Sequence, residues 1–174
     1  MSSDFTRIKN LQNFGKSSTT NLLILTGISG SGKTTTARHM ADHYGNVDII
    51  HLDAYFGLMP ESCRLKTFDK FLEHSSLYDG FYDKFPEAIL SDALFYAAQI
   101  FPTKRVIAEG AHWLDPIVEN SNPNIWESVK RNNMPIVVCE TTLNTACSRS
   151  TNSDKVDHYW QRVWMSAIPR LLAD

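Results

Sequence analysis

The sequence predicts an α/β fold in which a parallel sheet of about four to five strands carries helices on both faces. Two observations lead to this class. Short apolar runs alternate along the chain with longer segments whose apolar residues have helical spacing. The runs are apolar throughout rather than at every second position, so each strand is expected to be buried on both faces, as in parallel sheets. The predicted strands are residues 22–26, 47–52, 105–108 and 135–139.

The first half of the chain is predicted to contain two strands, one helix and a long irregular segment. The helix follows the strand 22–26 and covers residues 33–44, because its apolar residues fall at i, i+3, i+4 and i+7, and it ends before Gly45. The second strand, 47–52 (VDIIHL), comes next. Residues 54–83 are polar with interspersed aromatics, and we expect an irregular segment with short helices there.

The second half of the chain alternates helices and strands more regularly. A helix over 86–100 has a continuous apolar face and is followed by Pro102. Asn122 and Pro123 suit the cap and first turn of another helix. The remaining elements, in order, are a strand over 105–108, a helix over 122–132, a strand over 135–139, a short helix over 143–150 and a last helix over 155–172, which Pro169 is expected to disturb.

The chain is predicted to form a single domain after a short lead-in. It has 174 residues, enough for one sizeable core. Residues 1–20 are polar and are expected to be ordered only in part, and residues 21–174 form the domain. No apolar run approaches the roughly 20 residues that span a bilayer, and no signal peptide is evident. We therefore expect a cytoplasmic protein without a membrane partner, whose cysteines stay reduced: Cys63, Cys139 and Cys147.

Glycine-rich and acidic residues gather where the predicted strands end. A glycine-rich stretch, 27–34, follows the first strand, and Asp53 follows the second. Glu109 and Glu140 follow the third and fourth. Ligands of parallel α/β sheets bind beyond the carboxyl ends of the strands. The sequence therefore predicts one binding site at this edge of the sheet.

Residues 27–34 (GISGSGKT) match the phosphate-binding pattern G-x-x-x-x-G-K-[ST] between a predicted strand and a predicted helix. Glycines let the backbone wrap an anion, and the N–H groups of the loop and of the helix start then point at it. The pattern predicts the P-loop NTPase fold with bound ATP. The Lys33 ammonium is expected at the β- and γ-phosphates and the Thr34 hydroxyl on Mg²⁺. The ATP-binding set is Gly27, Ser29, Gly30, Ser31, Gly32, Lys33, Thr34 and Thr35.

Two acidic residues at neighbouring strand ends are candidates for the rest of the chemistry. Asp53 could accept the proton of a hydroxyl that attacks the γ-phosphoryl group. Glu109 could hold Mg²⁺ or its water ligands. The alternatives are that Asp53 caps the next turn and that Glu109 is a solvated strand-end charge.

Four segments resemble the uridine kinase and nicotinamide riboside kinase group of P-loop small-molecule kinases. They are GISGSGKTTTA, LDAYF, YDKFPEAILSDAL and IAEGAHW, and the resemblance covers about residues 22–112. The gluconate kinase group shares the loop but matches the later segments less well. The resemblance implies that Asp53 is the catalytic base, that Glu109 is associated with the metal and that Asp83 contacts the ribose of the acceptor. One extra residue in YDKFPEA leaves a helix cap as an equal alternative for Asp83.

The chain departs from this group after the fourth strand. The group has an arginine-rich lid there, whereas this chain offers Arg149 in a segment of about 147–158, with a solvated charge as the alternative. Lys33, Asp53 and Arg149 then form the expected catalytic set. No fifth strand is evident, so we expect four core strands ordered 2-3-1-4. Residues 55–85 are the expected acceptor-binding insertion, in which Tyr55 could stack on a base and Arg64 could bind an anion, or both could serve packing and solvation.

The sequence predicts a Mg²⁺- and ATP-dependent kinase that phosphorylates a hydroxyl of a small molecule. A nucleoside or another sugar-bearing metabolite is the favoured acceptor. One alternative acceptor is a hydroxyl on a nucleic acid, such as a modified base in DNA. The net charge of -2 argues against it, although the aromatic segment allows it. Another alternative is a nucleotide switch or NTPase without an acceptor, for which no water-positioning residue is evident.

Overall fold

The computed structural model describes residues 5–52, 86–114, 123–149 and 158–173. These contain a five-stranded sheet in the order β1-β5-β2-β4-β3. Neighbours among β2 to β5 are parallel, and β1 runs antiparallel to β5. The α/β class and the predicted order of the four parallel strands are therefore confirmed. The strands are β1 (Phe5–Lys9), β2 (Leu22–Thr26), β3 (Val47–His51), β4 (Arg105–Glu109) and β5 (Ile136–Glu140).

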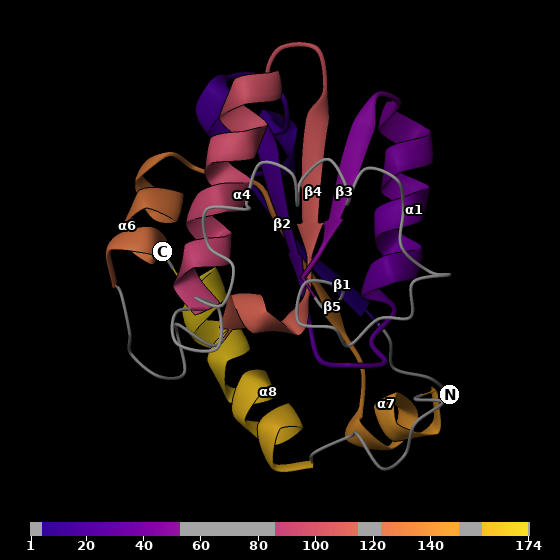
Figure 1. Ribbon diagram of the computed structural model, residues 1–174. Helices are drawn as coiled ribbons and strands as arrows, with labels where there is room; N and C mark the ends of the chain where they lie inside the picture. The colour runs from indigo at the N-terminus through magenta and orange to yellow at the C-terminus, as the bar shows by residue number, and fades with distance from the viewer. Residues whose placement is uncertain (1–4, 53–85, 115–122, 150–157, 174) are drawn as a thin grey trace.

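The helices cover both faces of the sheet (Figure 1), as the sequence predicts. The last helix is continuous through Pro169, which lies three residues before its end. The disturbance expected at this proline therefore does not interrupt the helix. None of the helices in the described ranges is long and apolar enough to cross a membrane. The helices are α1 (Lys33–Tyr44), α4 (Pro86–Ile100), α6 (Pro123–Arg131), α7 (Leu143–Arg149) and α8 (His158–Leu172), with 3-10 turns η1 (Leu11–Asn13), η2 (Ser18–Thr20) and η5 (Ala111–Leu114).

Strand β1 is a fifth strand and corrects the expectation of only four, and it lies within residues 1–20, the expected polar lead-in. All five of its residues pair with β5, from Phe5 opposite Glu140 to Lys9 opposite Ile136. The Arg7 guanidinium also lies 3.1 Å from the carboxylate of Glu140. The sequence gives little sign of this strand because an exposed edge strand of mixed polarity has no continuous apolar run. Ile8, for example, is 57% exposed.

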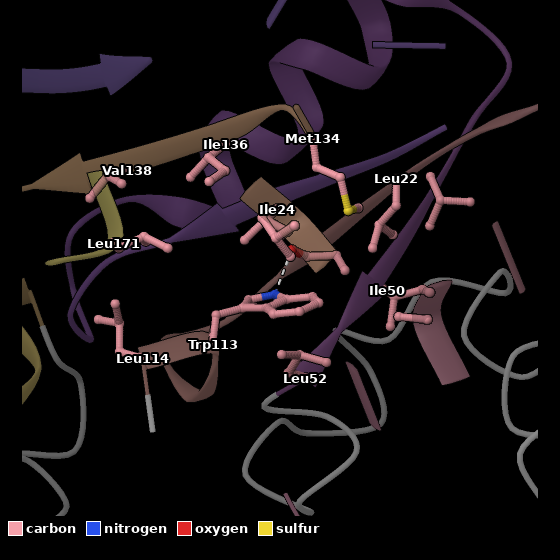
Figure 2. Close-up of a cluster of buried hydrophobic side chains, with 14 of the residues drawn as sticks. Leu22, Ile24, Ile50, Leu52, Trp113, Leu114, Met134, Ile136, Val138 and Leu171 are labelled. Carbon is pink, nitrogen blue, oxygen red and sulfur yellow. Dashed lines mark hydrogen bonds between the residues drawn. The ribbon is translucent and has the colours of Figure 1, made fainter. Parts of the chain in front are cut away.

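Alternation along the parallel strands divides the core into two layers. In β2, Leu22 and Ile24 face α4, α6 and α8, whereas Leu23 and Leu25 face α1. Figure 2 shows the first layer, in which the ring of Trp113 lies among aliphatic side chains of the strands. The Trp113 Nε1–H donates to the Ala108 carbonyl oxygen at 2.9 Å, which satisfies its polar atom within the core. The sheet is therefore buried on both faces, as its apolar strands require.

A polar cluster links α4 to the amino-terminal end of β3. This end of the sheet is opposite the strand ends that carry the glycine-rich loop. The carboxylate of Asp48 is 3% exposed. It accepts hydrogen bonds from the Tyr96 hydroxyl at 2.9 Å and from Lys104 Nζ at 2.7 Å. Burial, together with the adjacent carboxylate, raises the pKa of Tyr96 well above its ordinary value. The phenol therefore stays protonated and continues to donate.

We expect Tyr96→Phe to lower the free energy of unfolding by about 1–3 kcal/mol, because it removes a donor from a buried carboxylate oxygen. Urea unfolding followed by circular dichroism measures the change. Phe95→Leu, at the exposed neighbouring position, is the control and should stay within about 0.5 kcal/mol of the parent. Equal unfolding midpoints for the two variants would show that the Asp48 contact contributes nothing measurable.

Candidate functional site

The loop between β2 and α1 turns through three glycines with positive φ. Their φ angles are 140° at Gly27, 77° at Gly30 and 92° at Gly32. A Cβ at Gly27 would lie 2.2 Å from the Cys139 carbonyl oxygen, and one at Gly30 would lie 2.5 Å from the Ala146 carbonyl oxygen. Gly32 has open space around it. The first two glycines therefore allow the loop to approach β5 and α7, and the third allows only the backbone conformation.

Side chains hold the loop in place. Lys33, only 6% exposed, folds back so that its Nζ donates to the Ile28 carbonyl oxygen at 3.0 Å. The Ser29 N–H donates to Oε1 of Gln161, a buried residue of α8, at 3.0 Å. The Ser31 hydroxyl is buried and has no hydrogen-bond partner among the described residues. Buried polar atoms are usually satisfied, so this hydroxyl is one that a ligand could satisfy.

A buried carboxylate lies beside the start of α1. Glu109 ends β4, and His51 ends β3 at the position directly opposite in the register. Glu109 Oε1 accepts a hydrogen bond from the Thr34 hydroxyl at 3.0 Å and another from His51 Nδ1 at 2.5 Å. Glu109 Oε2 has no hydrogen-bond partner among the described residues. The carboxylate thus links β3, β4 and α1 through Oε1, while the buried Oε2 makes no hydrogen bond to the described residues.

Glu109 is ionised at neutral pH despite its 1% exposure. Burial by itself raises the pKa of this carboxyl. The hydrogen bond from His51, the positive charge of Lys33 and the hydrogen bond from Thr34 together outweigh burial, so the pKa lies below its ordinary value. The unpartnered Oε2 therefore belongs to a charged carboxylate.

The oxygen atoms of Thr34 and Glu109 fit a magnesium ion. Mg²⁺ prefers hard oxygen ligands and takes only one or two from the protein, with waters and phosphate oxygens completing its shell. Within the described ranges, no group of three or more His, Cys, Asp or Glu residues could hold a metal ion by itself. A cation at Thr34 and Glu109 would therefore depend on ligands brought by water and by a phosphate-bearing substrate.

A cavity of about 390 Å³ opens beside the glycine-rich loop. It brings Arg149, the exposed last residue of α7, to the same space as the loop residues Ser31 and Gly32. On its wall, the buried Cys139 thiol donates to the Thr36 hydroxyl at 3.5 Å. Burial raises the pKa of Cys139, so this thiol stays neutral. The cavity is lined by Thr6, Ser31, Gly32, Thr35, Thr36, Cys139, Glu140 and Arg149.

The structure brings several of the predicted site residues together. Lys33, Thr34 and Glu109 meet at the carboxyl ends of the strands, and Arg149 shares the neighbouring cavity with Thr35. Other predicted residues and segments lie outside the described residues. These are Asp53, Tyr55, Arg64 and Asp83, the acceptor insertion 55–85 and residues 150–157 of the lid 147–158.

Three residues of the site were not singled out from the sequence. Thr6 belongs to β1, which the sequence did not predict, and no local pattern links Gln161 to the loop. His51 had a usable signal, because it ends a strand that runs beside β4. Once that pairing is known, the register places it opposite Glu109.

Comparisons of this chain with protein-family models, with curated proteins and with solved structures find no significant match.

The loop geometry predicts unequal effects for two glycine substitutions. Gly27→Ala should lower the free energy of unfolding by more than about 3 kcal/mol, because it adds a backbone clash to an unfavourable φ. Gly32→Ala should lower it by about 1–2 kcal/mol, because only the φ is unfavourable. Urea unfolding of both variants tests the difference. Equal losses would mean that the Gly27 approach to Cys139 is not a constraint.

Proposed function

We propose that this chain is an ATP-dependent kinase of the P-loop NTPase fold that transfers the γ-phosphoryl group to a hydroxyl of a small molecule. One observation supports the proposal most directly. The Thr34 hydroxyl, at the start of α1, lies 3.0 Å from Oε1 of the buried and ionised Glu109. These two groups are 75 positions apart in the chain, and together they combine a cation site with a glycine-rich anion cradle.

Each described residue has a defined task in the proposed transfer. The loop N–H groups and the α1 amino terminus bind the phosphates, and the Lys33 ammonium supplies positive charge at the β- and γ-phosphates. Thr34 and Glu109 would hold Mg²⁺, which when bound offsets negative charge on the phosphoryl oxygens. Arg149 of α7 lines the 390 Å³ cavity beside the loop and would add positive charge there. Catalysis then comes from positioning and electrostatics.

The proposed acceptor binds where the chain continues beyond β3. In the sequence, Asp53 comes two positions after His51, which contacts Glu109. Asp53 is the proposed base for the attacking hydroxyl. Tyr55, Arg64 and Asp83 are the proposed acceptor contacts, and a nucleoside or another sugar-bearing metabolite is the proposed acceptor class.

An acceptor screen that measures ADP release and transfer of labelled γ-phosphate tests the function. The panel contains nucleosides, sugars and DNA with hydroxymethylated bases, each with ATP and MgCl₂. We expect ADP release that requires a small-molecule acceptor. Lys33→Ala should stay folded and lose transfer by at least about 10²-fold, because charge stabilisation at the phosphates is removed.

The other outcomes of the screen contradict the proposal in distinguishable ways. Transfer to DNA alone would assign a nucleic-acid acceptor. ADP release that needs no acceptor would assign an NTPase or switch. If ATP does not bind at all, or if Lys33→Ala transfers phosphate at the wild-type rate, the proposed phosphate cradle is wrong.

Asp53→Asn should separate nucleotide binding from chemistry. Asparagine keeps the shape of aspartate but cannot take a proton at neutral pH, so kcat should fall by roughly 10²–10⁴ with an almost unchanged affinity for ATP. Calorimetry gives the affinity, and steady-state rates with the acceptor from the screen give kcat. Retention of more than about a third of the wild-type kcat, under about 1 kcal/mol of barrier, would exclude Asp53 as the base if phosphoryl transfer limits the rate.

A further inference from the structure

A fully buried histidine and carboxylate sit side by side at the ends of two neighbouring strands, β3 and β4. His51 is 0% exposed and Glu109 is 1% exposed. The three residues before each of them in β3 and β4 are buried as well, and all except Asp48 are apolar. Removing two such polar groups from water is unfavourable, and apolar residues of similar volume often stabilise a core as well or better. The stability of the sheet alone is therefore a weak explanation for burying His51 and Glu109 together.

The hydrogen bonds at Glu109 are distributed unequally between its two oxygens. Oε1 receives both the Thr34 hydroxyl and His51 Nδ1, whereas Oε2 has no partner among the described residues. Two donors from different elements fix the rotation of the carboxylate. Because the Thr34 hydrogen is directed at Oε1, the lone pairs of its oxygen are left for another partner. Glu109 Oε2 and the Thr34 oxygen therefore belong to two side chains that are hydrogen-bonded to each other.

We propose that His51 is a positioning residue for the divalent cation. Its Nδ1–H holds Glu109 in the orientation that leaves Oε2 and the Thr34 oxygen open to the ion. This inference rests on the proposed function, and it adds a role that the loop motif does not contain. Groups that orient metal ligands commonly change metal affinity by about 10- to 100-fold when they are replaced. His51 itself would touch neither the nucleotide nor the acceptor.

Variants of His51 can separate this role from simple core filling. In His51→Asn, the amide nitrogen can take the place of Nδ1 and still donate to Oε1. In His51→Gln, the amide lies one bond further out, near the place of Nε2, so the donor at the Nδ1 position is lost while a polar side chain remains. His51→Leu keeps an apolar volume with no donor. His39→Asn, on the exposed side of α1, is the matched surface control.

The readout is the affinity for ADP, measured by calorimetry in EDTA and again with saturating MgCl₂. The dissociation constant for ADP in EDTA divided by the dissociation constant in MgCl₂ gives the coupling between metal and nucleotide. We expect His51→Gln and His51→Leu to reduce this ratio by about 10-fold or more, with ADP affinity in EDTA unchanged within about 2-fold. His51→Asn and His39→Asn should keep the ratio within about 3-fold of wild type. Urea unfolding checks that each variant is folded.

The possible failures are distinguishable. If folded His51→Gln keeps the wild-type ratio, His51 only fills the core and the inference is wrong, even if His51→Leu does not fold. If His51→Asn loses as much coupling as His51→Gln, a donor at the Nδ1 position is not what matters, and the inference is again wrong. If wild-type ADP affinity is independent of MgCl₂, the cation role of Glu109 fails while nucleotide binding stands. If the wild type binds no ADP in either condition, the proposed function itself is overturned.

Discussion

The candidate site depends on keeping one buried carboxylate charged. Glu109 lies at the end of a central strand with almost no exposure to water, where burial alone would favour its neutral form. Two hydrogen bonds to Oε1 and the nearby Lys33 charge reverse that preference. The two donors come from β3 and from the start of α1. The hydrogen bonds that stabilise the charge of Glu109 therefore also connect β3, β4 and α1.

The same elements determine where the glycine-rich loop runs. The loop leaves β2 between the two core layers, and its close approaches to Cys139 and Ala146 require glycine at positions 27 and 30. Gln161 of α8 holds it from one side of the sheet, and Lys33 of α1 folds over it from the other. The loop conformation is therefore imposed by both layers and by its own turn residues. A preorganised loop of this kind would suit the proposed phosphate site, because its backbone is already fixed before a ligand binds.

The antiparallel β1 forms one edge of the sheet and contributes residues beside the candidate site. It pairs with β5 along its whole length and places Thr6 on the wall of the cavity beside the loop. It also supplies Arg7, which neutralises the Glu140 carboxylate at the end of β5. An unpaired acid at that position would repel a phosphate-bearing ligand, so the ion pair makes the cavity more suitable for an anion.

Local sequence signals determined most of the strands and helices and the position of the glycine-rich loop. The apolar runs predicted the four parallel strands, and the spacing of glycines with Lys33 and Thr34 predicted the turn into α1. These features follow from side-chain periodicity and backbone freedom, which act over a few residues. Glu109 could be singled out because it ends an apolar run.

Only the tertiary structure decided which distant side chains share the site. The pairing of β1 with β5 joins segments about 130 positions apart. The sequence of a short exposed strand does not indicate which strand it pairs with. The contact of His51 with Glu109 depends on the register of β3 against β4, and the contact of Gln161 with the loop depends on how α8 packs on the sheet. Register and packing result from the burial of whole faces, which no single stretch of the sequence specifies.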